Sequence, residues 1–385
     1  MDNFIQYLDQ YKTKPIDYLN VIYTTNSHYY TNQLNDPKFT GLITSYDSWQ
    51  ANHEFKIVLQ PEPVKTIVCL DISVNSIGDL LDVIDQNVCN PNVKYNIDLK
   101  ALHNIRNELV ELNTMIGMET LKLSVLNQLI YFIQELHLDA KKKTCDFKHT
   151  IICGPPGTGK TEVAKIIGRM YSKVGILKNN TFKKVTRSDL IAGYLGQTAI
   201  KTSKVITESL GGCLFIDEAY SLANRGDSDI YSKECIDTIC EALSDHKDDL
   251  MVIIAGYEEE LNETFFKVNC GLKSRFLWKF KIDAYDANQM KMIFEKKVKQ
   301  NEWEISDDIS KWFDNKHKEF KHFGRDVEQL FSHVKICHSR RIFGKDVVMR
   351  KKITLADMDA GYKMFIENTQ NQQAKLDSSL YGFYL

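Results

Sequence analysis

Residues 149–161, HTIICGPPGTGKT, decide the fold of this chain. The apolar run at 149–153 predicts a buried strand, and residues 154–161 fit the pattern G-x-x-x-x-G-K-[ST]. In this pattern glycines let backbone N–H groups curl around phosphates, the lysine reaches phosphate oxygens, and the final hydroxyl ligates Mg²⁺. The N-terminus of the helix expected next adds its partial positive charge. We therefore predict a nucleotide-phosphate site made by Pro156, Gly157, Thr158, Gly159, Lys160 and Thr161.

A second block, residues 213–218 (CLFIDE), is an apolar strand that ends in two acids. Such a strand delivers carboxylates to the carboxyl edge of a parallel sheet, where nucleotides bind. By itself the pattern is equally typical of an ordinary strand end. Together with the phosphate loop it predicts that Asp217 and Thr161 hold Mg²⁺ and that Glu218 polarises the attacking water.

From about residue 109 short apolar strands alternate with amphipathic helices. Strands are predicted at 149–153, 182–186, 213–216, 250–255 and 278–282. This alternation predicts an α/β fold with a parallel sheet flanked by helices on both faces. After Asp283 the pattern is wholly helical, with helices expected at 286–300, 306–321, 325–341 and 354–367.

Residues 1–105 contain no recognisable motif and predict a small α/β domain of unknown role. Residues 55–59 and 66–70 alternate like strands, and Ser76 is expected to cap a helix that follows it. The remaining chain is predicted to comprise an α/β domain at 106–283, a helical subdomain at 284–370 and a flexible tail at 371–385.

Composition excludes several classes of protein. The chain has 385 residues, of which 43% are hydrophobic and 26% charged, and a net charge of −2. These values describe a globular protein and not a uniformly basic nucleic-acid coat. No apolar run is long enough for a membrane span, and the N-terminus lacks the apolar core of a secretory signal. Nine scattered cysteines without a CxxC pair favour reduced thiols in an intracellular, cytoplasmic protein.

Seven sequence blocks, in the right order, resemble those of the AAA+ ATPases. They are MIGMETLK, GPPGTGKTEVAKIIG, SDLIAGYLGQTAIKT, GGCLFIDEAYSL, VIIAGYEEEL, GLKSRF and FGRDVEQLF. More narrowly, the chain is similar to the branch that holds red-type Rubisco activase and stage V sporulation protein K. The resemblance covers roughly residues 109–367. It implies an AAA+ P-loop domain followed by a helical lid, which together bind ATP with Mg²⁺ and hydrolyse it.

The resemblance implies further site residues. Ile116 and Gly117 match the segment that packs against adenine. Arg275 matches the arginine finger, which reaches the γ-phosphate bound to a neighbouring subunit, and Arg325 matches the second sensor, which touches the γ-phosphate in its own subunit. A finger that acts between subunits implies a homo-oligomeric ring, usually a hexamer. The alternative for either arginine is an ordinary solvated or ion-paired surface residue.

At the first sensor the chain departs from the wider family. The strand at 250–255 is followed by Gly256 and Tyr257, where most AAA+ proteins have Asn or Thr. The narrower branch shares this AGY pattern. Tyr257 is a candidate for positioning the attacking water, and the sequence leaves that role open.

Residues 192–196, AGYLG, place an aromatic and an apolar residue between glycines. In the matching family position this loop lines the central pore and grips an extended polypeptide, so Tyr194 and Leu195 are the expected substrate contacts. The alternative is a buried tyrosine that covers the sheet edge. An aromatic loop favours a protein threader over a nucleic-acid motor, whose pore needs cations for phosphates.

The sequence therefore predicts an ATP-driven motor that remodels or threads protein substrates through a ring pore. A nucleic-acid motor is one alternative, and nucleic acid is the less expected partner. A nucleotide-gated scaffold with little turnover is the other, against which Asp217, Glu218 and Arg275 argue. Membership of the branch does not identify the polypeptide client.

Overall fold

The computed structural model describes residues 66–139, 144–194, 196–223 and 230–381, with the backbone alone at 20–25, 28–33, 139, 144–145 and 371–381. The chain divides into two units, Met1–Val68 with Asn90–Lys94, and Cys69–Cys89 with Tyr95–Leu385. In the first unit β1 (Asn20–Thr25) and β2 (His28–Gln33) form an antiparallel pair. Strand β3 (Thr66–Val68) pairs with β4 (Val93–Tyr95). The strand predicted at 55–59 lies outside the described residues.

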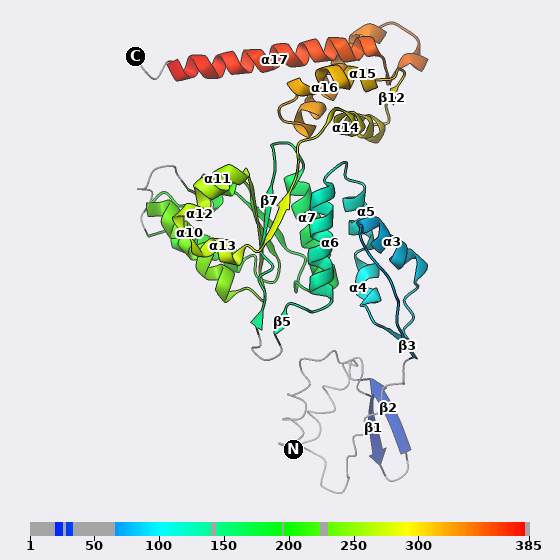
Figure 1. Ribbon diagram of the computed structural model, residues 1–385, viewed down its shortest axis with the longest axis vertical. Coiled ribbons are helices and arrows are strands. Elements are labelled where there is room, and N and C mark those ends of the chain that lie inside the picture. The colour runs from blue at the N-terminus through cyan, green and yellow to red at the C-terminus, as the bar shows by residue number, and fades with distance from the viewer. Residues whose placement is uncertain are drawn as a thin grey trace. The chain divides into compact units, whose positions relative to one another are not determined.

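A five-stranded parallel sheet forms the centre of the second unit (Figure 1). The order across the sheet is β11-β7-β10-β9-β8. The strands are β7 (Thr150–Cys153), β8 (Phe182–Val185), β9 (Cys213–Ile216), β10 (Met251–Gly256) and β11 (Trp278–Lys281). Each coincides with a predicted strand to within one residue at either end. The predicted α/β class with a parallel sheet is therefore confirmed.

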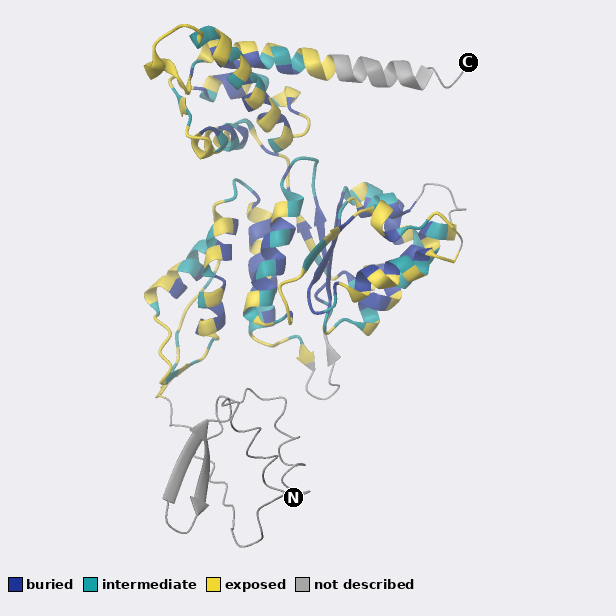
Figure 2. Cartoon of the chain, turned by 180° about the vertical axis from the view of Figure 1, so that it is seen from behind, coloured by how far each residue is buried: buried dark blue, intermediate teal, exposed yellow. Residues whose placement is uncertain are grey.

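Helices cover both faces of this sheet, and Figure 2 shows its central strands, β7, β10 and β9, as buried. Because side chains alternate along a strand, Ile152 and Phe215 face one layer while Ile151 and Leu214 face the other. The first layer contains α6 (Glu119–Ile133) and α7 (Lys160–Val174). The second contains α9 (Thr198–Thr207), α10 (Ile230–Asp245), α11 (Glu258–Glu263), α12 (Phe265–Val268) and α13 (Gly271–Arg275). Both layers exclude water from the sheet.

The helix predicted after Ser76 is α3 (Ile77–Gln86). The Ser76 hydroxyl accepts from the backbone N–H of Asp79, and the Asp79 carboxylate accepts from the N–H of Ser76, which forms a capping box. Buried residues of α3, α4 (Leu99–Asn104) and α5 (Arg106–Asn113) share a core with α6 and α7. These helices thus pack in the second unit, and the domain boundaries predicted from the sequence stay a prediction.

The chain after the sheet is a helical lid, as predicted. Its helices are α14 (Ala287–Gln300), α15 (Ser310–Lys316), α16 (Gly324–Ile342) and α17 (Leu355–Tyr381). Two short parallel strands, β12 (Glu304–Ile305) and β13 (Lys352–Ile353), were not predicted. One expectation is wrong: residues 306–321 do not form one helix. Helix α17 extends beyond the predicted end at residue 367, to Tyr381, and the flexible tail predicted at 371–385 stays a prediction. None of the described helices is long and apolar enough to cross a membrane.

The shortened helix α15 has a local cause. The N–H of Ser306 donates to the carbonyl of Ile353 at 2.8 Å, which extends the pairing of β12 with β13. Asp308 then accepts from the backbone N–H of Ser310 at 2.9 Å, so the helix begins only at Ser310. After α15 the chain tightens into a 3₁₀ turn, η4 (His317–Glu319).

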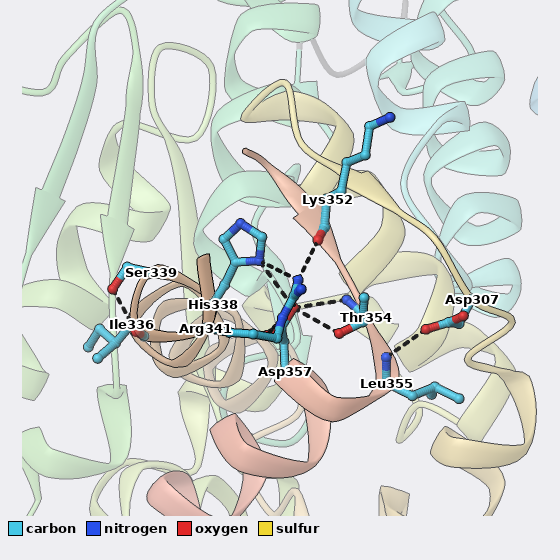
Figure 3. Close-up of polar contacts among 9 residues, drawn as sticks. All are labelled: Asp307, Ile336, His338, Ser339, Arg341, Lys352, Thr354, Leu355 and Asp357. Carbon is cyan, nitrogen blue, oxygen red and sulfur yellow. Dashed lines mark hydrogen bonds and ion pairs between the residues drawn. The ribbon is translucent and has the colours of Figure 1, made fainter. Parts of the chain in front are cut away.

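A buried charged cluster joins α16 to the start of α17 (Figure 3). Arg341 donates from Nε and Nη2 to the two carboxylate oxygens of Asp357, at 2.7 and 2.8 Å. His338 Nδ1 lies 3.1 Å from the same carboxylate. Burial alone would raise the pKa of Asp357, but hydrogen bonds from Arg341, Thr354 and His338 bring it down to about 2. This paired carboxylate therefore fixes the lid helices to each other.

A buried histidine, His149, ties β7 to its neighbours. Its ring is fully buried, its Nε2 lies 3.0 Å from the carbonyl oxygen of Leu243, and the N–H of Val252 donates to Nδ1 at 3.1 Å. With Nδ1 accepting, the ring is neutral and Nε2 is the donor. Burial lowers the pKa of His149 to about 3.

Stability should consequently fall as the pH drops below 6.5, the ordinary value for histidine. Between that pH and about 3 the unfolded chain binds a proton that the native chain does not, so each pH unit removes about 1.4 kcal/mol. From pH 7 to pH 5 we expect a loss of about 2 kcal/mol from this group, measured by urea unfolding. The variant His149→Gln, though less stable throughout, should show a shallower pH dependence. Equal slopes for both proteins would contradict this assignment.

Candidate functional site

The phosphate loop leaves β7 after Cys153 and enters α7 at Lys160, at the carboxyl edge of the sheet. Gly157 and Gly159 have φ values of +71° and +89°, a backbone conformation that favours glycine. Gly157 also faces the lid, where an added Cβ would lie 2.0 Å from the carbonyl oxygen of His322. The loop thus has the glycine-dependent backbone that a phosphate cradle requires.

Lys160 is held inside this loop. Its Nζ donates to the carbonyl oxygens of Gly154 and Pro155, both at 2.8 Å, and lies 5.4 Å from the centroid of the Tyr257 ring. Burial lowers the pKa of Lys160, although the two carboxylates after β9 act in the opposite direction. Phosphate oxygens would offer this partly buried ammonium stronger, charged acceptors than the two carbonyl groups.

Asp217 and Glu218 directly follow β9, at the same edge of the sheet. Thr161 Oγ1 lies 3.5 Å from Asp217 Oδ2. A hydroxyl and a carboxylate so placed are hard oxygen donors of the kind that Mg²⁺ prefers, so these residues fit the metal. Glu218 has φ +50°, a left-handed conformation that costs a non-glycine residue about 1–2 kcal/mol. Both carboxylates line a cleft of about 600 Å³ between α8 (Arg187–Leu190) and η3 (Ala219–Leu222).

Two stacked tyrosines stand beside these acids. The rings of Tyr220 and Tyr257 are 5.6 Å apart at 27°. Burial and the charge of Glu218 raise the pKa of Tyr220 to about 12, and they raise that of Tyr257 as well. Both hydroxyls therefore stay protonated at neutral pH. Tyr257, the candidate for the first sensor, thus has its ring against Lys160.

Gly117 lies beside the lid, next to Tyr285 and Gln289, and Ile116 precedes it in the chain. A Cβ added to Gly117, whose φ is +66°, would lie 2.9 Å from Nε2 of Gln289 on α14. The hydroxyl of Tyr285, just before α14, donates to the carbonyl of Thr158 at 3.0 Å. The predicted adenine segment and the phosphate loop therefore share one neighbourhood.

Arg325 is also next to the phosphate loop. The N–H of Gly324, at the start of α16, donates to the carbonyl of Gly157 at 3.1 Å. Arg325 is exposed, and its charge contributes to lowering the pKa of Lys160. The turn before α16 is held by Asp326, which accepts from the N–H of His322 at 2.7 Å. The lid thus brings Arg325 to the phosphate site of its own chain.

Arg275, the predicted arginine finger, lies apart from the residues around the phosphate loop of its own chain. Strands β11 and β7 are parallel, with Trp278 opposite Thr150 where both begin. Because Arg275 precedes Trp278, it lies at the amino edge of the sheet, whereas the phosphate loop leaves the carboxyl edge. Its Nε donates to Ser244 Oγ and its Nη1 to the carbonyl of Gly271, both at 2.7 Å. Arg275 is therefore not a ligand of the phosphate loop in its own chain.

Tyr194 is 74% exposed, so it does not cover the sheet edge as a core residue. An added Cβ at Gly193 or Gly196 would meet no atom within 4 Å, which shows how open this loop is. Ile200, in the first turn of α9, is also exposed, at 71%. The predicted partner of Tyr194, Leu195, lies outside the described residues.

Comparison with known proteins agrees with this geometry. Residues 150–276 match the family described as "ATPase family associated with various cellular activities (AAA)". A cfxQ-like protein of Acanthamoeba polyphaga mimivirus is 38% identical over 280 residues, which cover 71% of this chain and 68% of the relative. The chain belongs to the AAA family of ATPases. It is therefore a nucleotide-binding ATP hydrolase, in a family whose members typically assemble as rings.

Other relatives of this AAA chain are matched over smaller shares of their length. Stage V sporulation protein K of Bacillus subtilis is 35% identical over 210 residues, or 54% of this chain and 65% of that protein. ESX-1 secretion system protein EccA1 of Mycolicibacterium smegmatis is 37% identical over 166 residues, or 43% of this chain and 29% of that protein. The chain thus spans about two thirds of the first relative and under a third of the second.

The sequence did not point to several residues of this AAA site. Tyr220, Tyr285 and Gln289 reach it only because η3 and the lid fold against the phosphate loop. Lys184, on β8, contacts Asp217 Oδ2 at 2.6 Å, although nothing in its sequence neighbourhood marks it. The one available signal was a lysine two residues before the end of the strand predicted at 182–186.

Proposed function

We propose that this AAA ATPase is a motor that threads or remodels polypeptides through the pore of a homo-oligomeric ring, most simply a hexamer. The observation that carries this proposal is the exposed Tyr194 on its glycine-bounded loop. One relative is named as a secretion system protein, which agrees with a polypeptide client. The described cysteines of this chain are free thiols, which fits a reducing compartment such as the cytoplasm.

For hydrolysis, each residue of the site has a role that follows from its chemistry. Lys160 exchanges its two carbonyl acceptors for phosphate oxygens and compensates their charge. Glu218 faces the cleft and orients and deprotonates the attacking water. Thr161 and Asp217 would hold Mg²⁺, which supplies charge neutralisation at the phosphates when bound.

Arg275 would complete the site of the neighbouring subunit. Its place at the amino edge of the sheet keeps it from its own phosphate loop. A cation placed from outside at the γ-phosphate stabilises charge that develops during transfer.

Arg325 and Gly324 would couple the lid to nucleotide. The hydrogen bond from Gly324 to Gly157 joins the lid directly to the phosphate loop. A change at the phosphates therefore alters a contact that holds the lid, as a motor requires. Ile116 and Gly117 would place adenine beside the lid, where Gly117 lies next to Gln289 of α14.

The surface around Tyr194 fits a polypeptide better than a nucleic acid. Residues 190–200, LIAGYLGQTAI, contain no charged side chain. A loop that tracks a nucleic-acid backbone needs lysines or arginines, whereas an aromatic ring can press on any extended peptide.

The test is Tyr194→Ala, with Tyr194→Phe as the matched control. Because the ring is exposed, its removal opens no cavity in the core. Tyr194→Ala should therefore keep basal ATP hydrolysis within about twofold and the melting temperature within a few degrees. Stimulation of ATP hydrolysis by an unfolded model polypeptide such as casein should be lost in Tyr194→Ala and retained in Tyr194→Phe. Equal stimulation of all three proteins would contradict the threading role. Stimulation by single-stranded DNA or RNA instead would favour a nucleic-acid motor.

A further inference from the structure

Two adjacent lysines on β8 point to opposite faces of the sheet. Lys183 forms an ion pair with Glu208, at the end of α9, in the second helix layer. Lys184 lies opposite Phe215 in the strand register and faces the layer of α7, with Nζ 5.9 Å from the centroid of the Phe215 ring. Strand alternation thus directs only Lys184 toward the nucleotide site.

The partner of Lys184 is an oxygen of the site itself. Lys184 Nζ lies 2.6 Å from Asp217 Oδ2, and the same Oδ2 lies 3.5 Å from Thr161 Oγ1. The Asp217 side chain is 21% exposed and that of Lys184 44% exposed, so the ammonium can leave this oxygen for solvent without a backbone change. An ammonium therefore occupies the carboxylate oxygen that the proposed function gives to Mg²⁺.

We propose that Lys184 is a resident counter-ion of Asp217 which the divalent cation displaces when nucleotide binds. Lys184 thereby sets the free Mg²⁺ concentration at which the chain takes up ATP. This inference rests on the Mg²⁺ role proposed for Asp217 and Thr161. The physical reason is that one carboxylate oxygen serves one strong cation at a time, and two cations beside it repel each other.

The neutral variant Lys184→Met should bind ATP at lower free Mg²⁺. A partly exposed ion pair of this kind is worth enough to lower the half-saturating Mg²⁺ concentration by about two- to fivefold. The measurement is binding of a fluorescent ATP analogue, titrated with Mg²⁺, in a Glu218→Gln background that does not consume the nucleotide. Lys184→Gln repeats the test with a polar side chain should the apolar one disturb the fold.

Lys183→Met is the matched control, since it removes the neighbouring lysine from the same strand and should leave the Mg²⁺ midpoint unchanged. Lys184→Arg keeps the charge and should also stay close to the parent. An unchanged or higher midpoint in both neutral Lys184 variants would overturn the counter-ion role. If the parent bound the analogue equally well with Mg²⁺ and with EDTA, the Mg²⁺ role proposed for Asp217 would itself be contradicted. That result comes from the parent alone and is therefore distinct from a failure of the Lys184 proposal.

Discussion

Replacing Glu218 by glutamine should leave ATP binding intact and lower hydrolysis by about 10²–10⁴-fold. Glu218 faces the cleft at the end of β9, whereas the contacts that hold Lys160 come from Gly154 and Pro155. Glutamine has nearly the same shape as glutamate but does not accept the proton of the attacking water. Phosphate release measures turnover, and a fluorescent ATP analogue measures binding.

Two further variants give this experiment its controls. Lys160→Ala should lose binding as well as turnover, because it removes the charge that faces the phosphates. Glu263→Gln changes an exposed glutamate of α11 and should behave like the parent. Normal turnover in Glu218→Gln would remove this residue from the role of base.

Replacing Arg275 by alanine should lower ATP hydrolysis by about 10³-fold or more, the effect typical of an arginine finger. The structure places Arg275 at the opposite edge of the sheet from its own phosphate loop, so the loss should arise between subunits. ATP binding to the isolated subunit should be unaffected. Lys273→Ala, an exposed neighbour on the same helix, is the matched control.

Mixing two inactive proteins tests the arrangement directly. An interface between an Arg275→Ala subunit, which keeps Glu218, and a Glu218→Gln subunit, which keeps Arg275, has one complete site. We therefore expect the mixture to recover part of the parental activity. No recovery from rings that are shown to contain both subunits, or full activity of Arg275→Ala alone, would contradict action between subunits. Arg275→Ala also removes the hydrogen bonds to Ser244 and Gly271. Thermal melting of this variant shows whether their loss destabilises the subunit, apart from any loss of catalysis.

Local sequence was enough to predict the elements that depend on local physics. The phosphate loop needs glycine at Gly157 and Gly159 because those positions have positive φ. Short segments rich in apolar residues predict strands, and all five predicted strands lie in the sheet. The three that are apolar throughout, β7, β9 and β10, are also buried throughout. The Ser76 cap likewise involves atoms only three residues apart.

Where a distant segment decides the conformation, the sequence prediction failed. Residues 306–321 read as one amphipathic helix, yet pairing with β13 keeps Ser306 extended and delays α15 to Ser310. The order of the strands was equally beyond reach, because β10 inserts between β7 and β9 through contacts of long sequence separation.

The sequence by itself determined the loop, the two acids after β9 and the family, because each is written in consecutive residues. Only the tertiary structure decided which side chains meet them. Lys184 reaches Asp217 because β8 lies beside β9, and Tyr257 lies over Lys160 because β10 pairs with β7. Arg275 is separated from its own site because β11 runs parallel to β7. The physical reason is common to all three. Strand order and pairing register are set by the burial of complete faces of the sheet, and these faces are built from segments far apart in the sequence.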